Sequence, residues 1–83
     1  MVSRGNLPQK KRFLSLVRQL RLDAGLRQAD LAERLRKPQS FVSRYESGER
    51  RLDVLELRQI CAILGVEVVP TVVEFERSIL FAS

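Results

Sequence analysis

The chain has 83 residues, of which 45% are hydrophobic, which is enough for one folded domain with a modest core. It contains one cysteine and no histidine, so an internal disulfide is excluded and a transition-metal cluster would have almost no ligands. No apolar run approaches the roughly 20 residues that cross a bilayer, and the start resembles no signal peptide. We therefore expect a cytoplasmic protein without membrane contact.

The charges are divided unevenly along the chain. Residues 1–51 carry 13 Lys and Arg against 5 Asp and Glu, a net charge of +8, whereas residues 52–83 carry 2 against 5, a net charge of −3. This asymmetry indicates that the first part faces a polyanion, although solvated helix faces are also often basic. Charge alone does not decide between the two.

Residues 1–8 contain a glycine and a proline and show no hydrophobic periodicity, so we expect a flexible N-terminal arm. The basic run Lys10–Arg12 follows, and it either lies along phosphates or is simply solvated. A first helix is predicted from about Gln9 to Ala24, because Phe13, Val17 and Leu20 recur at helical spacing.

Two short amphipathic helices are predicted next, over residues 28–35 and 39–47. Arg36-Lys37-Pro38 separates them, because the residue before a proline avoids helical backbone and Pro38 suits the first turn of a new helix. Helices of about two turns are marginal alone in water, so these two must pack on each other and on the rest of the chain. The side chains that then point outward together are Gln39, Ser40, Ser43 and Arg44.

A fourth helix should begin after Asp53, because Glu56 stands three residues later, as in a capping box. Its predicted inward stripe comprises Val54, Leu57, Ile60, Cys61 and Leu64. Cys61 is expected to be a small core residue, since no histidine is present to activate it as a nucleophile. We predict no catalytic residues and no enzyme activity, because neither an evident pair of carboxylates nor a glycine-rich phosphate loop occurs.

The tail, residues 67–83, combines β-branched residues with a helical pattern that starts near residue 70 or 71. A strand at Val66–Val69, or through Val73, is the alternative. Apolar residues fall on two sides of the expected helix, which is more than a small monomer usually buries. Either the helix only closes the core, or one side contacts a second subunit, and we favour a homodimer. The predicted dimer interface comprises Val72, Phe75, Ile79 and Leu80.

Three fragments within residues 17–66 carry a family resemblance. They are Gly25-Leu26-x-Gln28-x-x-Leu31-Ala32, Ser43-x-Tyr45-Glu46-x-Gly48 and Leu64-Gly65-Val66. Together they resemble a helix-turn-helix domain of the Cro/lambda-repressor type, the XRE family. The resemblance implies an all-α bundle of about five helices, in which residues 9–66 bind DNA and the second and third helices form the helix-turn-helix.

The resemblance also implies roles for individual residues. Gln39, Ser40, Ser43 and Arg44 occupy the positions that contact bases in the major groove, whereas Phe41 either joins them or packs at the core edge. Arg21 and Glu46 match positions that commonly form an ion pair. The residues expected at the DNA backbone are Gln28, Arg27, Lys37, Arg36, Arg50 and Arg51.

Two residues depart from the family pattern. Arg27 stands where a Thr or Ser usually caps the second helix, and Arg36 stands where the turn usually has glycine, so Arg36 should carry left-handed strain. We expect a sequence-specific DNA-binding repressor that acts as a dimer and needs no cofactor. The alternatives are an antitoxin or restriction–modification controller of the same fold, which binds a protein partner through the tail, and an adaptor that no longer binds DNA.

Overall fold

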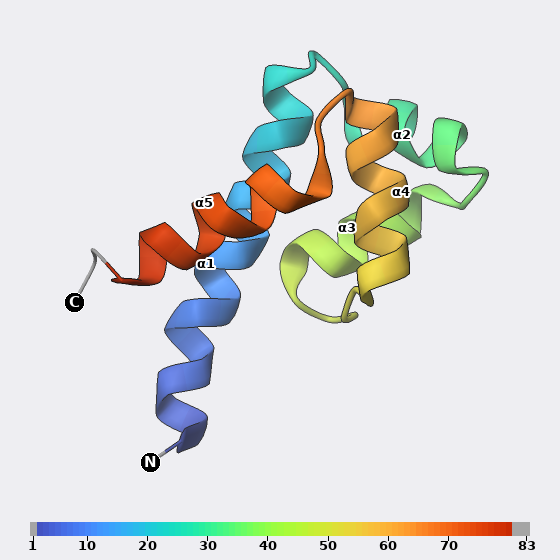
Figure 1. The fold of residues 1–83 in the computed structure, drawn as a ribbon. Helices are drawn as coiled ribbons and strands as arrows, with labels where there is room; N and C mark the ends of the chain where they lie inside the picture. The colour runs from blue at the N-terminus through green and yellow to red at the C-terminus, as the bar shows by residue number, and fades with distance from the viewer. Residues whose placement is uncertain (1, 81–83) are drawn as a thin grey trace.

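The computed structural model describes residues 2–80, with side chains from residue 8 onward, and this part contains five helices and no strand (Figure 1). The predicted all-α architecture is therefore confirmed. No helix in the described range combines the length and hydropathy needed to cross a bilayer. The helices are α1 (Val2–Asp23), α2 (Gln28–Leu35), α3 (Gln39–Ser47), α4 (Val54–Leu64) and α5 (Val68–Leu80).

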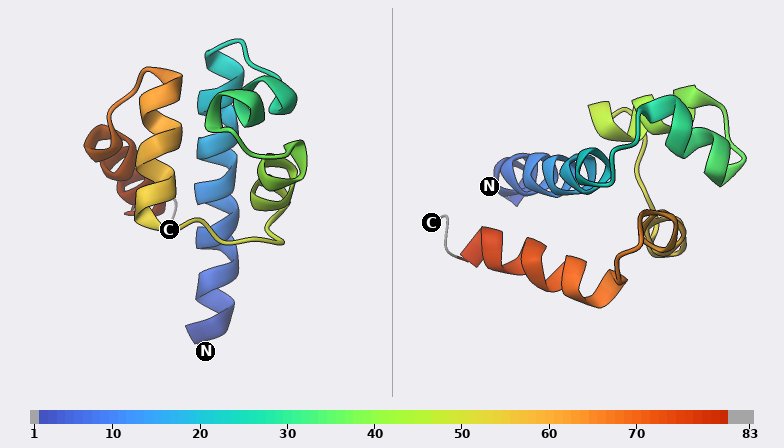
Figure 2. Two further views of the ribbon diagram at one scale, coloured as in Figure 1. Left: turned by 90° about the vertical axis from the view of Figure 1, so that its right-hand side faces the viewer. Right: turned by 90° about the horizontal axis from the view of Figure 1, so that it is seen from above.

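Helix α1 begins earlier than the sequence pattern predicts. It includes residues 2–8 and continues through Pro8, so the expected start near Gln9 is wrong and these residues have helical rather than irregular backbone. Pro8 has a φ that suits a helix but no backbone N–H, so α1 continues through it with one hydrogen bond fewer. The first turns of α1 extend beyond the rest of the bundle (Figure 2).

The bounds of α2 and α3 agree with the prediction, and the turn between them is tight. Arg36 has a left-handed conformation, with a φ of 59° and a ψ of 43°. The backbone N–H of Lys37 therefore reaches back to the carbonyl oxygen of Ala32 at 2.9 Å, which satisfies an acceptor at the end of α2. Pro38 is extended and leads directly into α3.

The core is formed mainly by α1, α2, α3 and α4, while α1 and α5 lie side by side at one edge of the bundle (Figures 1 and 2). Its members are spaced at helical intervals, so each helix presents one face inward. Cys61 is a buried free thiol, as predicted. The largest fully buried side chains are Val17, Leu31, Val42, Tyr45, Ile60 and Cys61.

Helix α4 begins with the predicted capping box. The Asp53 carboxylate accepts the backbone N–H of Glu56 at 2.7 Å, and the Glu56 carboxylate accepts the backbone N–H of Asp53 at 3.0 Å. The predicted inward stripe is wrong at its first member, since Val54 is 69% exposed. Val54 is the first residue of the helix, and the inward stripe begins one turn later at Leu57.

Helix α5 begins at Val68, about two residues before the predicted start, so the alternative of a strand at this point is wrong. No strand exists among the described residues to pair with these β-branched side chains, and packing overrides their preference. The buried Thr71 faces α4, with its Oγ1 3.8 Å from Cys61 Sγ. The Phe75 ring meets that of Phe13 in α1 edge to face, with centroids 5.4 Å apart.

Candidate nucleic-acid interface

Helix α3 has one face in the core and the opposite face in solvent. Val42 and Tyr45 on the inner face are fully buried, which removes the Tyr45 hydroxyl from water and raises its pKa above the usual value. The four polar side chains predicted to contact bases are exposed on the outer face: Gln39, Ser40, Ser43 and Arg44. Amide, hydroxyl and guanidinium groups are the ones that bond to base edges.

Phe41 does not belong to this outer row, which corrects its assignment as a base-contacting residue. Its side chain is 8% exposed, and its ring meets the Tyr45 ring edge to face at a centroid separation of 5.6 Å. The Cζ of Arg50 lies 4.6 Å from the Phe41 ring centre, and Lys37 Nζ lies 5.5 Å from it. The ring therefore packs at the core edge, the second of the two alternatives considered for it.

The turn before α3 supplies two of the predicted backbone-contacting cations. Arg36 and Lys37 are both exposed, and they stand next to the first turn of α3. The left-handed conformation expected at Arg36 is present.

The start of α2 compensates for the absent hydroxyl cap. Arginine has no side-chain acceptor, and instead the Asp30 carboxylate accepts the backbone N–H of Arg27 at 2.9 Å. The same carboxylate binds the Arg27 guanidinium at 3.0 and 3.1 Å. These bonds lower the pKa of Asp30 to about 2, and they engage the Arg27 side chain that was predicted to contact the DNA backbone.

The predicted ion pair between Arg21 and Glu46 is confirmed. Arg21 Nε and Nη2 donate to the Glu46 carboxylate at 2.7 and 3.0 Å, and Arg21 Nη1 donates to the carbonyl oxygen of Leu26 at 2.8 Å. The bond to Glu46 raises the pKa of Arg21. Gln28 Nε2 also donates to Glu46, at 2.9 Å, so the side-chain amide expected at a phosphate is engaged inside the domain.

The link between α3 and α4 contains the other two predicted cations, and they differ. Arg51 is exposed. Arg50 instead donates to both carboxylate oxygens of Glu56, at 2.7 and 3.0 Å, and this bond lowers the pKa of Glu56 to about 2. The Arg50 side chain, which was predicted to contact the DNA backbone, is thus engaged by Glu56 within the domain.

Lys10 is a residue whose placement the sequence did not predict. Its Nζ donates to the carbonyl oxygen of Gly48 at 2.9 Å, at the C-terminal end of α3. A cation at a helix C-terminus interacts favourably with the helix dipole. The basic run Lys10–Arg12 indicated a cation in this part of the chain. The local sequence did not indicate that Lys10 would bind the C-terminal end of α3, 38 residues away.

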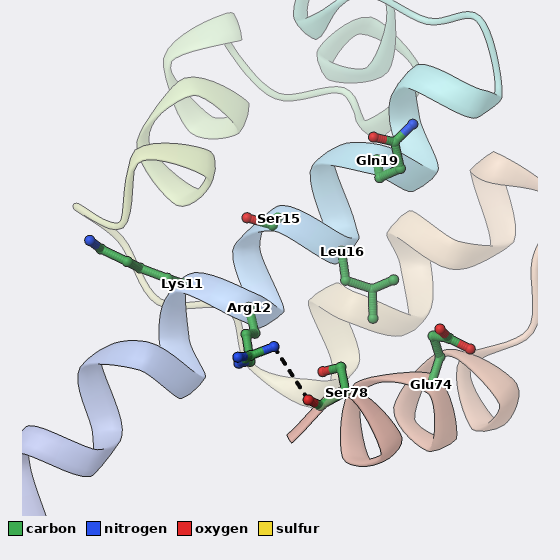
Figure 3. Close-up of a pocket in the computed structure, with 7 residues that line it drawn as sticks. All are labelled: Lys11, Arg12, Ser15, Leu16, Gln19, Glu74 and Ser78. Atoms are coloured by element: carbon green, nitrogen blue, oxygen red, sulfur yellow. Dashed lines mark hydrogen bonds between the residues drawn. The ribbon is translucent and has the colours of Figure 1, made fainter. Parts of the chain in front are cut away.

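A hollow of about 490 Å³ lies between α1 and α5, and its polar side chains do not converge on one point (Figure 3). Lys11 extends away from α5, whereas the Arg12 guanidinium reaches across and donates to the carbonyl oxygen of Ser78 at 3.3 Å (Figure 3). Ligand sites in proteins usually place several polar groups around one ligand. The outer face of α3 is therefore a better candidate for function than this hollow.

The predicted dimer-interface residues fall on two sides of α5. Phe75 and Ile79 are half-buried, and Phe75 packs on α1 within the same subunit. Val72 and Leu80 are exposed, at 46% and 60%, and two further exposed valines, Val69 and Val73, lie in the same helix.

Comparisons with known proteins agree with this architecture. A helix-turn-helix family model matches residues 17–69. An XRE-family-like protein from Pseudomonas syringae pv. tomato str. DC3000 has a similar structure, with a TM-score of 0.81 and 38% identity over 87% of this chain and 88% of that chain. No curated protein matches the sequence.

Two structures of the clp gene regulator ClgR from Corynebacterium glutamicum are also similar. Their TM-scores are 0.76 and 0.74, with identities of 24% and 25%. The matches cover 89% and 86% of this chain, and 79% and 91% of those chains.

Proposed function

This chain belongs to the helix-turn-helix family of the Cro/C1 type, the XRE family of DNA-binding transcriptional regulators, and on that premise we propose that it binds specific sequences in double-stranded DNA and represses transcription as a homodimer. The observation that carries the proposal is the exposed polar row on α3, which lies between two segments that bear arginine and lysine side chains. Since the proposed target is duplex DNA, we place its activity in the cytoplasm.

In the proposed complex α3 enters the major groove, which is about 12 Å wide and admits a helix. The amide of Gln39 is suited to adenine, and the guanidinium of Arg44 is suited to the O6 and N7 acceptors of guanine. Ser40 and Ser43 are short enough to let the helix approach the bases closely. Phe41 is omitted from this set because its ring is buried.

Contacts with the phosphate backbone are proposed on both sides of α3. Arg36 and Lys37 in the turn and Arg51 in the link are exposed cations that flank the groove-facing helix. The N-terminal end of α2 adds backbone N–H groups with a favourable dipole for a phosphate, at Gln28. Such contacts hold the helix in register but do not discriminate between sequences.

A dimer is proposed because one domain offers a small DNA contact surface, and two domains placed about one helical turn apart double it. The exposed valines of α5, Val69, Val72 and Val73, offer an apolar surface to a second copy. A dimer that covers two half-sites excludes other proteins from the same DNA, which is a direct route to repression.

The proposal is tested by selecting bound duplexes from a random pool. We expect a palindromic sequence whose half-sites are separated by about one helical turn. Binding should weaken steeply with rising salt, because phosphate contacts release counterions. Recovery of no preferred sequence, or binding that does not respond to salt, would rule out the proposal and favour an adaptor that does not bind DNA.

Two substitutions separate base contacts from backbone contacts. Arg44→Ala should reduce discrimination at one base pair by roughly 1–3 kcal/mol, because it removes a bidentate contact. Lys37→Ala should weaken binding to all sequences alike and flatten the salt dependence by about one phosphate contact. The measurement is the affinity of each variant for the selected duplex and for duplexes with single base changes, and exchanged effects would mean that α3 is not the groove-facing helix.

A further inference from the structure

Three side chains connect the first turn of α3 to the start of α4: Phe41, Arg50 and Glu56, which we name the link clamp. Both terminal nitrogens of Arg50 donate to the Glu56 carboxylate, at 2.7 and 3.0 Å. The Arg50 guanidinium also lies over the Phe41 ring, with its Cζ 4.6 Å from the centre. The Arg50 side chain thus contacts both Phe41 in α3 and Glu56 in α4.

Two residues of the link clamp, Arg50 and Glu56, make further hydrogen bonds. Arg50 Nη1 donates additionally to the carbonyl oxygen of Arg51, at 2.8 Å. The Glu56 carboxylate also accepts the backbone N–H of Asp53 in the capping box of α4. A planar guanidinium that is bidentate on a carboxylate and stacked on a ring has a well-defined orientation.

The same ring is also close to a cation from the other side of α3. Lys37 Nζ, in the turn before the helix, lies 5.5 Å from the centre of the Phe41 ring. The turn and the link that flank α3 therefore both meet one side chain that is 8% exposed and packed against the core. Both cationic segments thus have one side chain near the same ring.

We propose that the link clamp positions α3 relative to its flanking phosphate contacts, so that Glu56 is a positioning residue for sequence-specific DNA binding. The inference rests on the function proposed above. A carboxylate is repelled by phosphates, so any support that Glu56 gives to DNA binding is indirect and passes through Arg50. Arg50 then acts as a fixed connection between α3 and the link.

Glu56→Gln separates this role from simple electrostatics. The substitution keeps the size of the side chain and an oxygen that can cap α4, but it removes the negative charge that holds Arg50. If charge alone matters, the freed Arg50 binds a further phosphate, and all duplexes are bound more tightly with a salt slope steeper by about 0.9. If the clamp positions α3, affinity for the selected sequence falls while affinity for random sequence is kept or rises.

The experiment measures fluorescence anisotropy with two labelled probes, a duplex selected by the wild-type protein and a random-sequence duplex of equal length. For Glu56→Gln we expect the ratio of the two affinities to fall about tenfold, comparable to the loss of one base contact. Phe41→Leu should lower the same ratio, because leucine fills the core edge but offers no ring for Arg50. Equal tightening on both probes would overturn the inference.

Asp53→Ala is the matched control. It removes the other half of the capping box and leaves Arg50, Phe41 and Glu56 in place, so we expect it to preserve the affinity ratio. If the affinity ratio falls as much in Asp53→Ala as in Glu56→Gln, the loss of sequence preference comes from the start of α4. That result would overturn the positioning role of the link clamp. A wild-type protein that binds both probes equally would overturn the proposed function itself, which distinguishes the two failures.

Discussion

Arg21 is a charged residue in the core, only 5% exposed, and its guanidinium is satisfied by Glu46 and by the carbonyl oxygen of Leu26. An ion pair removed from water contributes little net stability, but a buried charge that loses its partner is costly. Glu46 also accepts the amide of Gln28, so one carboxylate connects α1, α2 and α3. We therefore assign Glu46 to the stability of the domain rather than to contact with DNA.

Glu46→Ala should lower the free energy of unfolding by about 3–5 kcal/mol, because Arg21 is left buried without a carboxylate. Chemical denaturation measures this loss. Glu49→Ala is the control, since it removes an exposed carboxylate from the neighbouring link and should change stability by less than about 0.5 kcal/mol. Wild-type stability in Glu46→Ala would show that the ion pair does not support the fold.

Arg36 combines a strained backbone with a charge placed beside α3. A left-handed conformation costs a residue with a Cβ roughly 1–2 kcal/mol, and glycine avoids this cost. Arg36→Gly should therefore raise the free energy of unfolding by about 1 kcal/mol while it weakens DNA binding through loss of a cation. Arg36→Ala loses the same charge but keeps the strain. We expect equal losses of DNA affinity and a gain in stability only for the glycine variant, measured by denaturation and by titration with DNA.

Helices α2 and α4 share one feature in their first turn. In each, the carboxylate of the residue three positions after the N-cap accepts the backbone N–H of the N-cap residue. In both cases an arginine binds the same carboxylate, Arg27 at Asp30 and Arg50 at Glu56. The pKa of each carboxyl is lowered to about 2, from ordinary values of 3.8 for Asp30 and 4.5 for Glu56. A lowered pKa means that these groups stabilise the folded state only when ionised.

Stability should accordingly depend on pH in the acid range. Above the unfolded pKa values the contribution of both carboxylates is fully present, and it is lost as pH falls from about 5 towards 2, through the folded values. Urea denaturation between pH 6 and pH 2 should show this decline for the wild type. The stability of Asp30→Asn should decline less over this range, because one of the two carboxylates is absent. An identical decline would mean that Arg27 does not lower the pKa of Asp30.

At the scale of the molecule, α5 has an inner face that completes the domain and an outer face that remains apolar. Phe75 and Thr71 belong to the inner face, against Phe13 and Cys61. Val69, Val72 and Val73 are 46–68% exposed. Helix α5 also lies away from α2 and α3 in the ribbon views, so a second copy can approach α5 without covering α3 (Figure 2).

Substitutions on the two faces of α5 should have opposite outcomes. Val72→Asp should produce a folded monomer, because it places a charge on the outer face without disturbing the core. Phe75→Asp should unfold the domain, since it buries a charge against Phe13. Sedimentation equilibrium and circular dichroism distinguish these states. A dimeric Val72→Asp variant would exclude this face as the interface.

Several features of the fold follow from sequence alone because they are local. The bounds of α2 and α3 are determined by Pro38, by glycine at the end of α3 and by apolar residues at helical spacing, all within one or two turns. The cap of α4 is equally local, since Asp53 and Glu56 are three residues apart. The pair between Arg21 and Glu46 came from the family resemblance, which carries information about distant residues.

Other features were decided only when the helices packed together. Periodicity assigns residues to a face of a helix, but it does not say what that face will meet, so Phe41 became buried beneath Arg50, and Phe75 packed on Phe13 while Val72 stayed exposed. The basic residues of the first half all contributed to one charge pattern, yet the fold places carboxylates beside only some of them. Arg27 is engaged by Asp30 and Arg50 by Glu56, whereas Arg36, Lys37 and Arg51 are exposed beside α3. The chain thus specified by itself which segments are helical and basic, and it also set the local pair of Arg27 with Asp30, three residues apart. Tertiary packing decided the contacts that cations make between helices, such as Arg50 over the Phe41 ring, because these depend on distances that local sequence does not set.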